Sequence, residues 1–354
     1  MNHVLTIVGA RPQFVKAAVV SNALSKAGIS EQIIHTGQHY DDAMSTVFWK
    51  ELGIPAPSIN LGVGSETHGK QTGIMLQKIE AFILNADQKP SALLVYGDTN
   101  STLAGAIVAS KLHIPVVHVE SGLRSFNKEM PEEINRIMTD HVSDLLFCSS
   151  NIGVKQLEKE GITKGVHNVG DVMYDAVLTF SKIASEKISL SDITDLQSDD
   201  FALATIHRPS NTDKLNNLRS ILSAFSQMNI PIIWPVHPRN KSRLKDQIIP
   251  DNLKLIDPVS YFEMMVLLKN CSKVFTDSGG LQKEAYWMKK KCITLRNETE
   301  WVETLDSNWN SLVGPDTKKI IAAYGSEPTS KWQKLYGDGN ASEKIALVIE
   351  NFLN

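Results

Sequence analysis

Three acidic side chains occupy positions that suit proton transfer. Asp98 follows the apolar run ALLVY and Glu120 follows the run PVVHV, and both runs are typical of strands buried on both faces. Because the carboxyl ends of parallel strands lie along one edge of a sheet, we expect the two carboxylates at the same edge. Glu132 lies four residues before Arg136, and on a helix these two residues share a face. Carboxylates gathered in this way can act as general acid and base.

The second half of the chain carries two histidines and a glycine-rich turn. His207 and His237 each close an apolar run beside an arginine, and a histidine can exchange a proton near neutral pH. The segment Ser278-Gly279-Gly280 stands between a strand and a helix, with Glu284 one turn into that helix. Glycines let the backbone approach a ligand, and a helix N-terminus suits a phosphate. Glu284 is placed for sugar hydroxyls, as is the acidic residue on a nucleotide ribose.

An arginine beside another helix N-terminus offers an anion site near the start of the chain. Gly9 ends the first apolar run, Pro12 suits the first helical position, and Arg11 lies between them. Its guanidinium and the backbone N–H groups favour a phosphate or a carboxylate. The chain has no GxGxxG fingerprint at a strand end, which disfavours a nicotinamide dehydrogenase, and it has no P-loop or HExxH motif.

Several of these features also have a purely structural explanation. Asp98 would suit the N-cap of the following helix, and acids behind a proline compensate the helix dipole. Arg11 would suit a solvent-facing position in an ordinary turn. Glu120 is harder to explain in this way, because burying a carboxylate at the end of an apolar strand is costly. The segment DSGG resembles the nucleophile region of trypsin-like serine proteases, but those proteins need an all-β double barrel, which this chain cannot form.

Apolar runs and amphipathic segments alternate along the chain, which is typical of βαβ units and parallel sheets. We expect strands at 4–8, 32–36, 92–96, 115–119, 145–149, 201–206, 230–236, 253–257, 273–277 and 292–296. We expect helices at 12–27, 41–52, 68–86, 100–112, 131–143, 151–160, 214–228, 260–270 and 279–290. The predicted fold class is α/β, with two Rossmann-like, doubly wound domains that face each other across a cleft.

A polar, acidic segment divides the two series of elements. The predicted domains are residues 1–184 and residues 201–341, with the linker region 185–200 between them. The last stretch, 342–353, has the pattern of an amphipathic helix, and no strand follows it. We expect this helix to return to the first domain.

Composition excludes several classes of protein. The 354 residues include 36 Lys and Arg against 39 Asp and Glu, a net charge of −3, which argues against nucleic-acid and membrane partners. No 18-residue apolar run and no secretory signal are present, so we expect a cytoplasmic protein. Cys148, Cys271 and Cys292 are too far apart for a CxxC site.

Eight segments taken together resemble the non-hydrolysing UDP-N-acetylglucosamine 2-epimerases. They run in order from Leu5 to about Leu312, and their agreement in register makes the resemblance specific: GARPQFVKA, HTGQHYDD, YGDTNSTLAGA, HVESGLRS, MPEEINR, ATIHRP, PVHPR and DSGGLQKEA. The resemblance implies a GT-B-like pair of Rossmann domains with the active site in the cleft. It also implies a UDP-sugar substrate, a homodimer, and no redox cofactor or metal.

The family mechanism implied by this resemblance is elimination and re-addition. Removal of the C2 proton accompanies anti elimination of UDP, and UDP adds back to the 2-acetamidoglucal after protonation from the other face. The positions that match the family's acid/base groups are Asp98, Glu120, Glu132 and His207. The positions that match its substrate contacts are Arg11, Lys16, Arg136, Arg208, Ser278, Gly279, Gly280 and Glu284.

One segment departs from the family pattern. Many members have an acid before the asparagine of the HR motif, whereas this chain reads His207-Arg208-Pro209-Ser210-Asn211. In bacterial members this loop borders a second UDP-sugar site that activates the enzyme. The matching residues here are Gln38, His39, Gln71 and His237. The missing acid bears on that activating site and on the identity of the sugar.

Two substrates of the same family fit this sequence. The first is UDP-GlcNAc, converted to UDP-ManNAc for bacterial surface polysaccharides such as lipopolysaccharide O-antigen, and the sequence slightly favours it. The second is UDP-2,3-diacetamido-2,3-dideoxy-glucuronate. More remote alternatives are a GT-B glycosyltransferase, a hydrolysing epimerase and a non-catalytic UDP-sugar sensor. A transferase does not need three carboxylates at the sugar, and a sensor has no use for His207.

Overall fold

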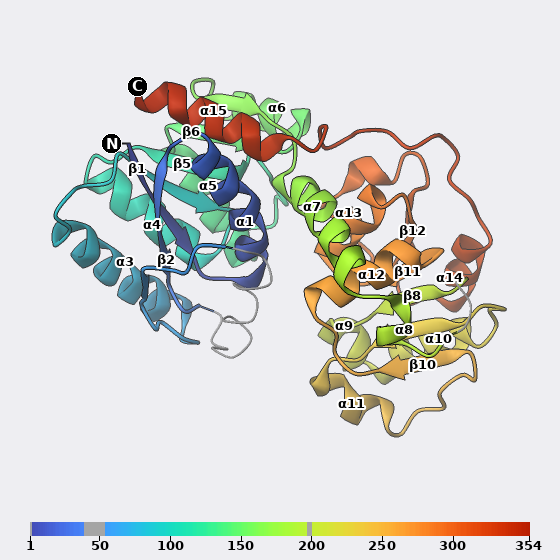
Figure 1. Cartoon of the computed structure of the whole chain (residues 1–354). Helices are drawn as coiled ribbons and strands as arrows, with labels where there is room; N and C mark the ends of the chain where they lie inside the picture. The colour runs from blue at the N-terminus through green and yellow to red at the C-terminus, as the bar shows by residue number, and fades with distance from the viewer. Residues whose placement is uncertain (1, 39–53, 197–199) are drawn as a thin grey trace. The chain divides into compact units, whose positions relative to one another are not determined.

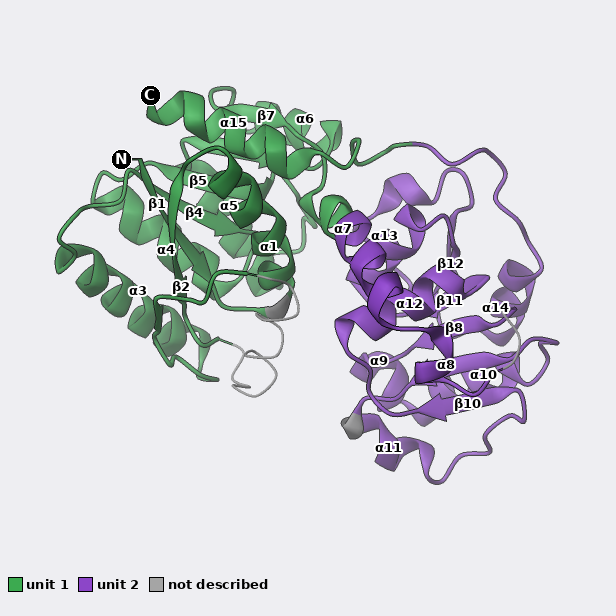
Figure 2. Ribbon diagram, viewed as in Figure 1, with its two compact units in different colours: residues 1–176, 334–354 green, residues 177–333 purple. Residues whose placement is uncertain are grey.

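Two separate parallel sheets carry the fold in the computed structural model, which describes residues 2–38, 54–196 and 200–354. The chain divides into unit 1, residues 1–176 and 334–354, and unit 2, residues 177–333 (Figure 2). Each unit is an α/β structure built from Rossmann-like βα repeats, so the predicted α/β class with two such units is confirmed. That they face each other across a cleft stays a prediction.

Unit 1 contains a seven-stranded sheet of order β3-β2-β1-β4-β5-β6-β7, in which every pair is parallel. Its strands are β1 (His3–Val8), β2 (Ser30–His35), β3 (Ile59–Asn60), β4 (Ala92–Tyr96), β5 (Val116–Ser121), β6 (Leu145–Cys148) and β7 (Val166–Asn168). Its helices are α1 (Arg11–Lys26), α3 (His68–Leu84), α4 (Asn100–Lys111), α5 (Pro131–Val142), α6 (Asn151–Lys159) and α15 (Ala341–Leu353), with the start of α7 (Val172–Lys187).

Unit 2 repeats the same winding in a six-stranded parallel sheet of order β10-β9-β8-β11-β12-β13. Its strands are β8 (Ala202–Thr205), β9 (Ile232–Pro235), β10 (Leu253–Ile256), β11 (Lys273–Thr276), β12 (Lys291–Thr294) and β13 (Asn310–Leu312). Its helices are α8 (Leu190–Ile193), α9 (Pro209–Thr212), α10 (Leu215–Phe225), α11 (Pro238–Leu244), α12 (Tyr261–Asn270), α13 (Gly279–Trp287) and α14 (Thr317–Tyr324), with a short 3-10 turn at Val302–Thr304.

The boundary between the units differs from the one expected from sequence. It falls at Ala176 within α7, because this helix runs on from one unit into the other, and the polar segment 185–200 lies in unit 2. The chain returns to unit 1 at Lys334, and its last helix, α15, packs against α1 (Figure 1). No helix among the described residues is long and apolar enough to cross a membrane.

The central strands of the unit 1 sheet are buried, and this burial fixes where their carboxyl ends lie. Every residue of β4 is buried, and β1 is buried from Val4 onward, so these strands lie in the middle of the sheet and their carboxyl ends are fixed by the core. Helices α1, α4 and α13 begin within a few residues of the ends of the strands that precede them. Their N-terminal backbone N–H groups therefore lie at the edge where ligands bind in such sheets.

Candidate active site

Two acid–cation pairs lie at the carboxyl edge of the unit 1 sheet. Lys16 Nζ on α1 contacts Glu120 Oε2 at the end of β5, and both side chains are largely buried. Arg136 Nη2 on α5 contacts Asp98 Oδ2 just after β4. Asp98 and Glu120 thus lie at the ends of neighbouring strands, each beside a cation, as expected from their places in the sequence.

Glu120 has an unusual backbone. Its φ is +72°, and the pairing of β5 with β6 shifts register between Val119 and Ser121. Such left-handed conformations are rare for residues with side chains and concentrate at functional sites. The preceding turn is adapted to it: Gly97 has φ +63°, and a Cβ at this position would lie 3.3 Å from Glu120 Oε2.

Two contacts differ from those expected from the sequence: the N-cap of α4 and the acid on α5 that pairs with Arg136. Thr99, not Asp98, caps α4, since its side chain accepts a hydrogen bond from the backbone N–H of Thr102. The spacing of Glu132 and Arg136 predicted a shared face, but Arg136 pairs instead with Glu133, with 2.6 Å between Nη1 and Oε2.

The carboxylate of Glu133 has several partners, which explains this choice. It accepts the backbone N–H groups of Ser125 and Phe126 at 2.9 Å each, so the preceding loop holds it in place beside Arg136. Glu132 is exposed. No hydrogen bond or ion pair among the described residues joins it to Asp98, Glu120 or Arg136, and its catalytic role stays a prediction.

Gln13 is a residue of this edge that sequence reasoning missed. Its Oε1 accepts the backbone N–H groups of Gly9 and Ala10 at 2.7 and 3.0 Å. Its Nε2 donates to the carbonyl of Tyr96 at 2.7 Å, across to the end of β4. This buried side chain therefore joins the turn after β1 to the turn that carries Asp98. The Arg11 backbone begins α1, and its side chain lies outside the described part of the structure.

The residues that match an activating site are only partly brought together. Gln38 Oε1 accepts the backbone N–H of Ser101 at 3.1 Å, and Gln71 Oε1 accepts Asn100 Nδ2 at 2.8 Å. Both amides therefore meet the first turn of α4, close to Asp98 in the chain. His39 lies outside the described residues. His237 is exposed and belongs to unit 2.

In unit 2 the buried Asp277 organises the turn that carries His207. Its carboxylate accepts the backbone N–H of His207 and of Arg208, each at 3.0 Å, and Nδ2 of Asn211 at 3.0 Å. The ring nitrogen Nδ1 of His207 lies 3.4 Å from Asp277 Oδ1, while 52 % of the His207 side chain is exposed. The histidine is therefore held at its base and open to a ligand at its tip.

The glycine-rich turn forms the N-terminus of α13, as the sequence predicted. Ser278 caps the helix and Gly279 begins it. A Cβ at Gly279 would lie 3.7 Å from Arg296 Nη1, and Arg296 is paired with Glu300 at 2.9 Å. The turn therefore combines helix N-terminal N–H groups with a nearby guanidinium, an arrangement suited to phosphate oxygens.

Burial shifts the pKa of two candidate acids upward. Removal from water raises the pKa of Asp98 above its ordinary value, and Glu120 adds to this effect, although Arg136 opposes it. Burial also raises the pKa of Glu284 to about 7, opposed by the charge of Lys283. Acids shifted toward neutrality are suited to carrying a proton at physiological pH.

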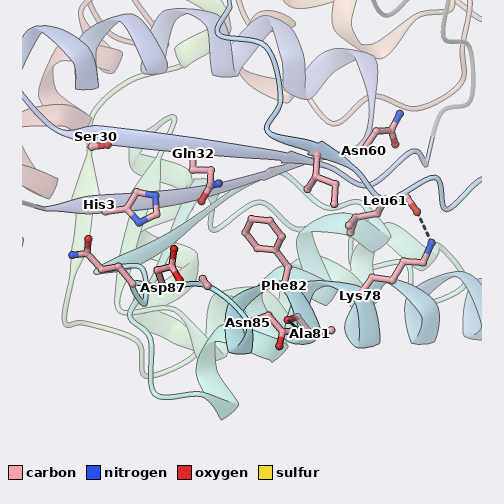
Figure 3. Close-up of a pocket in the computed structure, with 13 residues that line it drawn as sticks. His3, Ser30, Gln32, Asn60, Leu61, Lys78, Ala81, Phe82, Asn85 and Asp87 are labelled. Atoms are coloured by element: carbon pink, nitrogen blue, oxygen red, sulfur yellow. Dashed lines mark hydrogen bonds between the residues drawn. The ribbon is translucent and has the colours of Figure 1, made fainter.

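A cavity in unit 1 lies away from these groups. It measures about 880 Å³ and is bounded by β2, β3 and α3, with Gln32, Lys78, Phe82 and Asp87 in its wall (Figure 3). None of the candidate site residues lines it. In the described part of the chain, no group of three His, Cys, Asp or Glu side chains could hold a metal ion.

Two Rossmann-type sheets with acid–cation pairs at one sheet edge, and with a glycine-rich helix N-terminus in the other unit, define a class of enzymes that bind nucleotide-activated substrates. The chain belongs to the UDP-N-acetylglucosamine 2-epimerase family, whose model matches residues 22–350. It is accordingly a UDP-sugar 2-epimerase, an isomerase, and the resemblance noted from its sequence motifs is confirmed.

Individual relatives extend over nearly the whole chain. A UDP-N-acetylglucosamine 2-epimerase homolog of Methanococcus maripaludis is 50% identical and covers 98% of this chain and 99% of its own. The UDP-2,3-diacetamido-2,3-dideoxy-D-glucuronate 2-epimerase of Pseudomonas aeruginosa is 47% identical over 97% of this chain and 98% of its own. The crystal structure of Methanocaldococcus jannaschii UDP-GlcNAc 2-epimerase in complex with UDP-GlcNAc and UDP is 40% identical, has a TM-score of 0.85, and covers 99% of both chains.

Proposed function

We propose that this enzyme inverts C2 of a UDP-activated 2-acetamido sugar by eliminating UDP and adding it back. The observation that carries the proposal is the pair of strand-end carboxylates, Asp98 and Glu120, each beside a cation at one edge of the unit 1 sheet. Family membership supports the reaction class, and the similarity to an enzyme crystallised with UDP-GlcNAc and UDP supports a UDP-sugar substrate.

The reaction needs only proton transfer and stabilisation of a diphosphate. A carboxylate removes the C2 proton, the C1–C2 double bond forms, and the C1–O bond breaks with its electrons passing to UDP. An acid then returns a proton to C2 on the opposite face while a diphosphate oxygen bonds to C1. No electrons are gained or lost overall.

The described side chains divide these tasks between them. Burial raises the pKa of Asp98 above its ordinary value, which favours its role as the proton-carrying acid, and Lys16 holds the Glu120 carboxylate in place. In unit 2, the N-terminus of α13 at Gly279 suits the diphosphate, and Glu284 suits the ribose hydroxyls. His207, exposed at its tip, is the further proton-transfer group.

For the sugar itself, we propose UDP-2,3-diacetamido-2,3-dideoxy-glucuronate. The relative of that activity is 47% identical, against 40% for the crystallised UDP-GlcNAc enzyme. The loop after His207 also lacks the acid present in many UDP-GlcNAc 2-epimerases. UDP-GlcNAc is the second candidate. It is supported by the Methanococcus maripaludis relative, which is 50% identical and is named a UDP-N-acetylglucosamine 2-epimerase homolog. With either sugar, we expect the product to supply bacterial surface polysaccharide synthesis in the cytoplasm, with the enzyme working as a homodimer.

The test is proton NMR of the purified protein in D2O with each UDP-sugar in turn. We expect product and recovered substrate both to carry deuterium at C2, with faster turnover of the diacetamido uronate. Glu120→Gln should abolish exchange, whereas Glu66→Gln, an exposed control in the same unit, should leave it unchanged. Product that retains its original C2 hydrogen would exclude elimination, and faster turnover of UDP-GlcNAc would reverse the order of the two sugars.

A further inference from the structure

A fully buried histidine lies two residues before Glu120 and has no role in the reaction described above. His118 is on β5, and each of its ring nitrogens has a partner. Nδ1 lies 2.7 Å from Asp140 Oδ1 on α5, and Nε2 lies 2.8 Å from the carbonyl oxygen of Gly97. The ring therefore spans from helix α5 to the turn that carries Asp98.

Both partners of this ring accept hydrogen bonds and cannot donate them. A backbone carbonyl carries no hydrogen. Burial by itself would raise the pKa of Asp140, but the hydrogen bond and charge of His118, together with Arg124, bring it below its ordinary value. The other oxygen of Asp140 accepts from the backbone N–H of Gly122 and from Arg124, contacts that a carboxylate makes best. With a carboxylate and a carbonyl as its partners, His118 makes two hydrogen bonds only when both ring nitrogens carry hydrogen.

Asp140 also holds the turn on the other side of Glu120. Its Oδ2 accepts the backbone N–H of Gly122 at 3.1 Å and Arg124 Nη1 at 2.6 Å. Arg124 in turn donates from Nε and Nη2 to the two carboxylate oxygens of Glu160 at 2.8 and 2.7 Å. Arg124 is thus hydrogen-bonded to two acids, Asp140 and Glu160, and Asp140 contacts both Arg124 and His118.

We propose that His118 is a positioning residue, protonated on both ring nitrogens, that holds the turns carrying Asp98 and Glu120 in register. Gly97 directly precedes Asp98, and Gly122 follows Glu120 by two residues. The left-handed backbone of Glu120 needs such support, because this conformation is unfavourable by itself. The inference rests on the catalytic roles proposed above for these two carboxylates.

The protonation state can be measured without any substrate. In protein labelled with 15N-histidine, both ring nitrogens of His118 should show protonated-type chemical shifts at the pH of the activity assay. The resonance is assigned by its disappearance in His118→Asn. A nitrogen that lacks hydrogen would overturn the proposal. Because this measurement uses the free protein, it is separate from any failure of the epimerase reaction itself.

Two substitutions each remove one of the contacts. His118→Asn keeps an N–H near the position of Nδ1 but cannot reach Gly97, whereas His118→Gln reaches toward Gly97 and loses the Nδ1 contact. We expect kcat to fall about tenfold to a hundredfold in both, because displaced catalytic groups lose rate steeply. KM for the UDP-sugar should change less than about threefold, since the segment proposed to hold the diphosphate lies in unit 2.

His167→Asn is the matched control, because His167 packs on Phe147 in the same sheet. Circular dichroism and thermal melting report the folded fraction of each variant. Folded His118 variants with the kcat of the control would overturn the proposal. A fall in kcat that only matches the unfolded fraction of the variant would also overturn the proposal, because it would reflect a loss of folded protein alone.

Discussion

The Asp277 carboxylate at the end of β11 accepts the backbone N–H of His207 at 3.0 Å, and the Asp277 backbone N–H donates to the carbonyl of Thr205 at 3.2 Å. One fully buried acid thereby joins two neighbouring strand ends of unit 2 and fixes the base of the candidate catalytic histidine. In the sequence, Asp277 is the residue before the Ser278-Gly279-Gly280 turn, and nothing in that segment predicts its contacts with the His207 turn.

Replacement of this acid tests its supporting role. In Asp277→Asn the amide can accept fewer of the three converging N–H groups, and its own NH2 faces donors. We expect the free energy of unfolding to fall by about 2–3 kcal/mol, together with a loss of kcat. Denaturant titration and steady-state kinetics measure the two effects. Asp257→Asn, an exposed control, should change neither, and wild-type stability in Asp277→Asn would contradict the role.

His207 itself should behave differently, because only its backbone is held firmly by the protein. His207→Asn keeps size, polarity and the backbone hydrogen bond to Asp277, so we expect stability to stay within about 1 kcal/mol of wild type. Turnover should fall at least about 10²-fold if the ring transfers a proton. Kinetics and thermal melting of the same samples decide the matter. A folded variant with near wild-type turnover would show that the histidine is not catalytic.

Much of the fold could be predicted, and the exceptions have physical reasons. The long buried strands β1, β4 and β5 and the helices α1 and α4 that follow two of them carry strong sequence signals. The short edge strands β3 and β7, of two and three residues, were missed because they are too short to show a pattern. Helix α7 was missed as well, and the boundary between the units falls within it.

In the candidate site, too, some residues could be predicted from their place in the chain and others could not. The positions of Asp98 and Ser278 at strand ends could be predicted, because their place in the chain fixes their place in the sheet. Gln13 and Asp277 were missed because their importance lies in contacts with residues distant in sequence. The choice of Glu133 over Glu132 beside Arg136 depends on which acid the preceding loop binds, and helical spacing alone does not determine that.

Gly97 offers a test of the packing around Glu120. Its φ is +63°, and a Cβ added at this position would lie only 3.3 Å from Glu120 Oε2, so a side chain would crowd the carboxylate. In Gly97→Ala we expect a loss of about 1–2 kcal/mol in stability from the left-handed backbone. We also expect a disproportionate fall in kcat, because the new methyl group displaces the Glu120 carboxylate. Gly161→Ala, also at positive φ but in open space, is the matched control for strain alone.

If both alanine variants lose the same stability and neither loses kcat, the Cβ is accommodated without moving Glu120. If Gly97→Ala alone loses kcat while its stability matches that of Gly161→Ala, the contact with Glu120 accounts for the difference. The two readouts, unfolding free energy and kcat, therefore separate backbone strain from displacement of the acid.

Glu284 predicts a specific dependence of stability on pH. Its pKa is about 7 in the folded protein because of burial, against 4.5 in the unfolded chain. Between these values the folded form binds more protons than the unfolded form, so stability falls as the pH rises through this window. Above pH 7 the carboxylate is ionised in both states, and the lost stability is not recovered.

Glu284→Gln removes this titration while keeping the shape of the side chain. Relative to wild type, the variant should gain about 2–3 kcal/mol in unfolding free energy between pH 5 and pH 8. Urea titrations of both proteins at pH 5 and pH 8 measure the difference in unfolding free energy between variant and wild type. The contributions of all other titrating groups cancel in this difference, because both proteins contain them. A difference that does not change with pH would show that Glu284 loses its proton at its ordinary pKa. Its carboxylate would then be mostly ionised over this whole pH range in the folded and the unfolded protein alike.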